Sequence, residues 1–110
     1  MLDCIEKLCY NTNGKRKYAL KEFYMPTISM FRGIKIFMNW NDHMPPHFHA
    51  TYGGTEALIS IHELEVIDGN IPGKQIKMIL GWAALHQEEL LENWELARQR
   101  QELFAIDPLR

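Results

Sequence analysis

The fold of this chain is decided by one stretch, which reads His47-Phe48-His49-Ala50-Thr51-Tyr52-Gly53-Gly54-Thr55-Glu56-Ala57-Leu58-Ile59-Ser60. A Gly-Gly pair stands in it between two runs in which apolar and polar residues alternate. Glycine adopts positive φ angles at little steric cost, so this pattern predicts a two-residue hairpin turn at Gly53 and Gly54. The predicted register pairs Tyr52 with Thr55 and ends with His47 opposite Ser60.

The two faces of this hairpin differ in chemistry, because successive side chains of a strand point to opposite faces. One face is apolar and is the predicted core face; it holds Phe48, Ala50, Tyr52, Ala57, Ile59 and Ile61. The other face gathers ionisable side chains; it holds His47, His49, Thr51, Glu56, Leu58, Ser60 and His62. A shift of one residue in register would exchange the two faces.

The flanking sequence completes an α+β pattern. Upstream, Ile28 and Met30 alternate with Ser29, and a second alternating run follows Gly33, which predicts another antiparallel hairpin. Downstream, Pro72 suits a first helical position, and apolar residues recur with helical spacing from residue 76 to 97. We therefore expect a small antiparallel sheet packed against a long C-terminal helix that reaches about Gln101. Gly81 and the outward-facing Leu85 leave a kink or two helices open.

Composition indicates one globular domain, because the 110 residues are 46% hydrophobic and 24% charged. We place this domain at residues 25–110 and read residues 1–24, which lack sustained periodicity, as a weakly organised extension. No apolar stretch approaches the about 18–20 residues that span a bilayer, so no membrane association is expected. The only cysteines are Cys4 and Cys9, which excludes cysteine-based zinc motifs from the histidine-rich segment and favours a reducing cytoplasm.

Charge argues against general binding of nucleic acids. Residues 1–24 hold five of the 12 Lys and Arg and three of the 14 Asp and Glu. The remaining chain therefore holds seven basic and 11 acidic residues, a net charge of −4. A domain of this charge has no overall attraction for phosphate backbones, so any contact with RNA would be local.

The segment Asp42-His43-Met44-Pro45-Pro46-His47-Phe48-His49 is the candidate functional site. Residues i and i+2 of a strand face the same way, so His47 and His49 can direct two imidazoles to one point. With His43 as a third donor, they predict a site for zinc or a similar divalent metal. Without metal, His47 and His49 with Glu56 could serve as general acid and base on a phosphodiester. A third alternative is that the histidines only shape a structural or contact surface.

Four motifs resemble the bacterial domain of unknown function 4160 family: Met25-Pro26-Thr27-Ile28, Phe31-Arg32-Gly33-Ile34, the segment 42–50 with the pattern D-H-x-P-P-H-F-H-A, and Leu91-Glu92-Asn93-Trp94. The resemblance runs from about Met25 to the C-terminus. It implies no activity, because none is established for the family. Its members resemble small proteins encoded beside another short protein, as in toxin–antitoxin gene pairs, which implies a small protein partner. Members usually begin at the Met-Pro-Thr motif, so residues 1–24 depart from the pattern.

Two functional classes remain open at this point. The first is a partner-binding component of a toxin–antitoxin-like gene pair with a histidine-rich functional surface, and we favour it slightly. The second is a small hydrolase or nuclease that uses a metal or histidine acid–base chemistry, with RNA as a possible substrate. A catalytic site should bring its side chains together within hydrogen-bond or metal distance, whereas a binding module should expose a flat or apolar patch.

Overall fold

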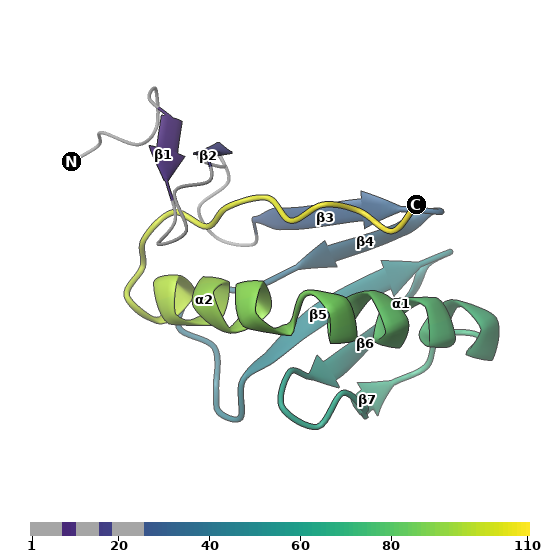
Figure 1. Ribbon diagram of the computed structural model, residues 1–110. Coiled ribbons are helices and arrows are strands. Elements are labelled where there is room, and N and C mark those ends of the chain that lie inside the picture. Colours follow the sequence, from purple (N-terminus) through teal and green to yellow (C-terminus); the bar gives the residue numbers. More distant parts are fainter. Residues whose placement is uncertain (1–7, 11–15, 19–25) are drawn as a thin grey trace.

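A five-stranded antiparallel sheet forms the centre of the protein in a computed structural model that describes residues 8–10, 16–18 and 26–110. Its strands follow chain order and are β3 (Thr27–Phe31), β4 (Ile34–Phe37), β5 (His47–Tyr52), β6 (Thr55–Ser60) and β7 (Val66–Gly69). Two helices, α1 (Gly73–Leu85) and α2 (Gln87–Arg98), run across one face of this sheet (Figure 1). The predicted α+β fold is therefore confirmed.

The central hairpin has the predicted register. β5 pairs with β6 from His47 opposite Ser60 to Tyr52 opposite Thr55. Gly53 and Gly54 form the turn with φ angles of +56° and +84°, values that L-amino acids rarely adopt. The predicted core face is also confirmed, because it is buried except for the partly buried Tyr52 at its end; the fully buried members are Phe48, Ala50, Ala57, Ile59 and Ile61.

The first hairpin forms as expected, but the alternation assigned to β3 is wrong at Met30. Arg32 and Gly33 make its two-residue turn, with φ angles of +52° and +78°. The pairing of β3 with β4 is irregular between Thr27 and Ser29. Such a bulge changes the phase of the strand, so Met30 is 64% exposed while the next residue, Phe31, points into the core.

The single long C-terminal helix is not confirmed, because the chain forms two helices that meet at His86. This residue leaves helical geometry, with φ −122° and ψ 26°. Its N–H bonds to the carbonyl of Ala83, and its own carbonyl accepts the N–H of Leu90 and so starts α2. The break lets Trp82 and Trp94 both enter the core and leaves Leu85 exposed. Pro72 lies just before α1 instead of at its first helical position.

The C-terminal segment after α2 closes the core. Asn93 binds both the N–H and the carbonyl of Phe104 through its side-chain amide. The N–H of Ile106 then bonds to the carbonyl of Ile28 in β3 at 2.8 Å, so this segment lies along the edge of the sheet (Figure 1). The Trp82 indole donates to the carbonyl of Asp107 at 2.8 Å, which fixes α1 to the same segment.

The structure describes only part of the expected N-terminal extension. Within it, β1 (Leu8–Tyr10) and β2 (Arg16–Tyr18) pair with each other as a separate two-stranded sheet. Residues 1–7, 11–15 and 19–25, including Cys4, lie outside the described residues, so the division of the chain at residue 25 stays a prediction. No helix in the described ranges is both long enough and apolar enough to cross a bilayer.

Candidate metal centre

His47 and His49 lie on the same face of β5, as their spacing predicts, but this face is covered. The two residues are only 7% and 8% exposed. The His49 ring stacks on Phe37, its cross-strand neighbour in β4, with ring centroids 4.8 Å apart. The His47 ring lies 5.3 Å from that of Trp94 in α2. Both imidazoles are therefore held in place by aromatic neighbours on two different elements.

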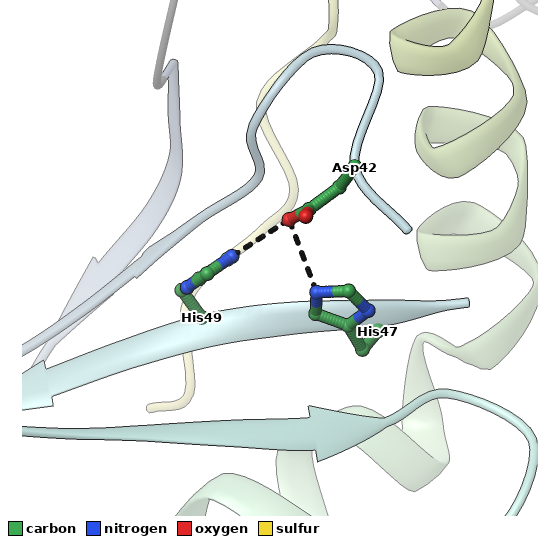
Figure 2. A group of neighbouring side chains, drawn as sticks. All are labelled: Asp42, His47 and His49. Atoms are coloured by element: carbon green, nitrogen blue, oxygen red, sulfur yellow. Dashed lines mark hydrogen bonds and ion pairs between the residues drawn. The ribbon is translucent and has the colours of Figure 1, made fainter. Parts of the chain in front are cut away.

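The loop between β4 and β5, residues 38–46, brings a carboxylate to the two histidines. Asn41 turns this loop with a φ angle of +61°, and Asp42 follows it. Oδ2 of Asp42 lies 3.0 Å from Nε2 of His47 and 2.9 Å from Nε2 of His49. Figure 2 shows the carboxylate pointing from the loop to both rings. These three side chains can each offer a ligand atom within 4.8 Å of the others.

The other nitrogen of each ring also faces an oxygen. His47 Nδ1 lies 2.8 Å from the carbonyl oxygen of Pro45. His49 Nδ1 lies 3.0 Å from Oε2 of Glu56, its diagonal neighbour on β6. All four ring nitrogens thus face hydrogen-bond acceptors, although a neutral imidazole carries only one N–H. The Nε2 atoms of both rings thus converge on one carboxylate oxygen, an arrangement that a cation shared by the three side chains would also satisfy.

The carboxyl of Asp42 is ionised at neutral pH. Burial opposes ionisation of its carboxyl, but hydrogen bonds from the His49 ring and the His43 backbone N–H outweigh that effect, together with the charges of His47 and His49. The pKa of Asp42 therefore lies below its ordinary value of 3.8. A carboxylate in this state can accept two N–H donors or bind a metal ion.

The distances between the donor atoms of Asp42, His47 and His49 suit a shared metal ion as well as hydrogen bonds. Donors on adjacent octahedral positions, each about 2.1 Å from an ion, lie about 3.0 Å apart, and tetrahedral donors lie about 3.4 Å apart. The Asp42–His47 and Asp42–His49 distances of 3.0 and 2.9 Å are close to the octahedral value. A ligating histidine also usually donates its second N–H to a carboxylate or carbonyl, and Glu56 and Pro45 offer these acceptors.

The residues named from the sequence divide into three groups. The first group is His47 and His49, whose Nε2 atoms both contact Oδ2 of Asp42. Glu56 touches the far nitrogen of His49, and its side chain is 53% exposed, so it orients that ring instead of sharing the central position. His43 is exposed and stands outside the group of possible ligands; only its backbone N–H bonds to Asp42. His62 is exposed as well.

Asp42 was missed as a donor, although it begins the same histidine-rich segment. The available signal was a carboxylate directly beside His43 in the sequence. In the part of the chain that the structure describes, Asp42, His47 and His49 are the only group of three or more possible metal ligands. The prediction of His43, His47 and His49 as ligands stays untested by any bound ion, but the geometry favours Asp42 as the third donor.

Comparison with known proteins gives one family match. The family model described as "Domain of unknown function (DUF4160)" matches residues 33–95. This range contains Asp42, His47 and His49, the strands β4 to β7, α1 and most of α2. Comparison with curated proteins and with solved structures gave no match.

Proposed function

This chain belongs to the DUF4160 family, whose description assigns no activity, and we propose from the site itself that Asp42, His47 and His49 bind one divalent metal ion for hydrolytic chemistry. The observation that carries this proposal is that all four imidazole nitrogens face oxygen acceptors. A cation at the centre of the site would explain why the Nε2 atoms of His47 and His49 both point at Oδ2 of Asp42. The acceptors beside the two Nδ1 atoms then fix the rings in the orientation that ligation requires.

Double protonation explains the same contacts at a higher electrostatic cost. The ring centroids of His47 and His49 lie 5.3 Å apart. Two positive charges at that separation repel by about 3 kcal/mol at an effective dielectric constant of about 20. One metal ion replaces both Nε2 protons and adds coordination bonds that protons cannot make.

The donor set supports a catalytic ion more than metal-free acid–base chemistry. Two imidazoles and one carboxylate would leave coordination positions for water, and a bound divalent ion would supply the acidified water that phosphodiester hydrolysis needs. Metal-free catalysis needs a ring nitrogen that is available to the substrate. Here each ring nitrogen of His47 and His49 already contacts a protein oxygen. The Asp42 side chain, 18% exposed, is the most accessible donor to solvent.

The test is metal content together with activity. Full-length protein is stripped with chelator, dialysed and titrated with Zn²⁺, Mn²⁺ or Co²⁺ by calorimetry; we expect one ion per chain. His47→Gln and His49→Gln should abolish binding, and His62→Gln, which changes an exposed histidine of the same hairpin region, is the matched control. Hydrolysis of bis(4-nitrophenyl) phosphate and of RNA should require the ion and stop with chelator. Binding that survives both His47→Gln and His49→Gln would overturn the proposal.

A second candidate function, favoured by the exposed edge of the sheet, is partner binding within a toxin–antitoxin-like gene pair. β7 is the edge strand, and within the described residues it pairs only with β6. Its Val66 and Ile67 are 38% and 47% exposed. Such an edge can accept a strand from a small protein partner in the reducing cytoplasm. Co-purification with the product of the neighbouring gene, lost on Ile67→Lys and retained in His47→Gln, is the expected result.

A further inference from the structure

Asn39 lies two residues after β4, beside the candidate metal centre. One atom of its side-chain amide contacts His49, whereas the other has no hydrogen-bond partner in the part of the chain that the structure describes. Nδ2 of Asn39 is 3.3 Å from Nε2 of His49. Oδ1 is buried and has no hydrogen-bond partner among the described residues. A buried amide oxygen ordinarily needs a donor, and no donor in the described ranges holds the Asn39 oxygen in this orientation.

The same His49 nitrogen also contacts Asp42. Nε2 of His49 lies 2.9 Å from Oδ2 of Asp42, which can only accept a proton or bind a cation. A ring nitrogen offers one in-plane position, either an N–H or a lone pair. If Nε2 carries a proton or a metal ion that Asp42 also binds, it has no lone pair left for Nδ2 of Asn39. The amide therefore presents a donor where the site calls for an acceptor.

A half-turn of the amide removes this conflict. The nitrogen and oxygen of an Asn side chain are nearly equal in shape, so their assignment follows from the hydrogen bonds they make. Turned in this way, Oδ1 takes the position 3.3 Å from Nε2 of His49. We propose that Oδ1 of Asn39 is the fourth protein donor of the centre, beside Asp42, His47 and His49. This inference rests on the proposed metal function.

The geometry and chemistry of the four donors agree with this assignment. The 3.3 Å between the Asn39 amide and His49 Nε2 lies within the about 3.0–3.4 Å expected for neighbouring ligand atoms around one divalent ion. Two imidazole nitrogens and two oxygens make a mixed donor set, which leaves positions for water around a six-coordinate ion such as Mn²⁺ but fills a four-coordinate Zn²⁺ site. Oxygen donors favour harder ions such as Mn²⁺, whereas imidazole also suits Zn²⁺. The fourth donor should therefore matter for Mn²⁺ as well as for Zn²⁺.

The test uses two variants of Asn39 in the full chain. Asn39→Ala removes the oxygen, whereas Asn39→Asp keeps an oxygen at the same reach and removes the amide N–H. Affinity for Zn²⁺ and for Mn²⁺ is measured by calorimetry, and coordination is followed by the visible absorption of bound Co²⁺. Asn70→Ala, at an exposed position, is the matched control. Circular dichroism confirms that each variant is folded.

We expect Asn39→Ala to bind both ions at least tenfold more weakly, Asn39→Asp to bind them as tightly as wild type or more tightly, and Asn70→Ala to be unchanged. A Zn²⁺ and Mn²⁺ affinity of Asn39→Ala within twofold of wild type would overturn the fourth donor while leaving the three-donor site intact. Asn39→Asp binding as weakly as Asn39→Ala would also overturn it, because the oxygen would then not be the group that acts. Wild type that binds no ion would end both proposals. If Asn39→Ala does not fold, the Co²⁺ spectrum and affinity of Asn39→Asp decide alone.

Discussion

The substitution Asp42→Asn isolates the charge at the centre of the site, because it keeps the shape of the side chain and removes only its negative charge. In the metal-free protein, Asp42 accepts hydrogen bonds from His47 and His49 at 3.0 and 2.9 Å. A hydrogen bond to a charged group contributes about 1.5–3 kcal/mol, and a neutral one about 0.5–1.5 kcal/mol. Loss of charge in both bonds should therefore lower the free energy of unfolding by about 2–3 kcal/mol.

The substitution Asp42→Asn should also reduce the stabilisation that bound metal gives the folded protein. This loss should be of similar size to the loss in the metal-free protein, and it is measured separately. An ion at a hundred times its dissociation constant stabilises the folded state by about 2.7 kcal/mol. If the loss of the carboxylate weakens binding about a hundredfold, the upper end of the range for supporting residues of metal sites, the same ion concentration stabilises Asp42→Asn by only about 0.4 kcal/mol. The stabilisation gained on adding metal should thus fall by about 2.3 kcal/mol.

Urea unfolding with chelator and with excess Zn²⁺ measures both quantities on the same protein. Asp107→Asn, which changes an exposed carboxylate, serves as the control and should behave as wild type in both conditions. An Asp42→Asn variant with wild-type stability in chelator would show that Asp42 does not hold the two rings. Equal stabilisation of wild type and Asp42→Asn by Zn²⁺ would show that Asp42 is not a ligand.

Two further predictions concern pH and the N-terminal residues. The pKa of Asp42 is lowered from 3.8, so its stabilising contribution is complete above that pH and is lost as the pH falls through the folded-state pKa. In chelator, the difference in unfolding free energy between wild type and Asp42→Asn should therefore shrink towards zero in strong acid. A difference that stays constant with pH would refute this prediction. Deletion of residues 1–24 should change the free energy of unfolding by no more than about 0.5 kcal/mol, and loss of a cooperative urea transition would show instead that these residues belong to the core.

The central hairpin was predictable because its signals are local and agree with one another. A Gly-Gly turn fixes the register, and the two-residue period of the flanking runs then assigns every side chain to a face. Both followed from the sequence between His47 and Ser60, and the observed pairing is the predicted one. The break between the helices was less accessible, because Gly81 and Leu85 pointed to the right part of the chain but not to His86.

The periodicity of the sequence could not predict which residues lie over the face of β5 that carries His47 and His49. Alternation in β5 states which side chains share a face, but not what lies over that face. Asp42 reaches the histidines from the β4–β5 loop, directly after the positive φ of Asn41, and Figure 2 shows its carboxylate between the two rings. His43 was predicted as a ligand because it carries an imidazole. The direction in which a loop side chain points depends on the backbone conformation of the loop, which the sequence pattern did not predict. Asn39 was missed for the same reason, and no spacing rule connects it to His49.

All three central donors lie within residues 42–49, a single short stretch of loop and strand. Closing so short a loop costs little chain entropy, so an ion need not draw together distant parts of the chain. The three donors would accompany the hairpin wherever it forms, while Phe37 of β4 and Trp94 of α2 hold the two rings in place. The segment 42–49 can therefore be moved to another protein as one short piece of chain that carries all three donors. Transferred into an unrelated antiparallel hairpin of the same register, together with Glu56 and with counterparts of Asn39, Phe37 and Trp94, it should carry its ion-binding capacity with it.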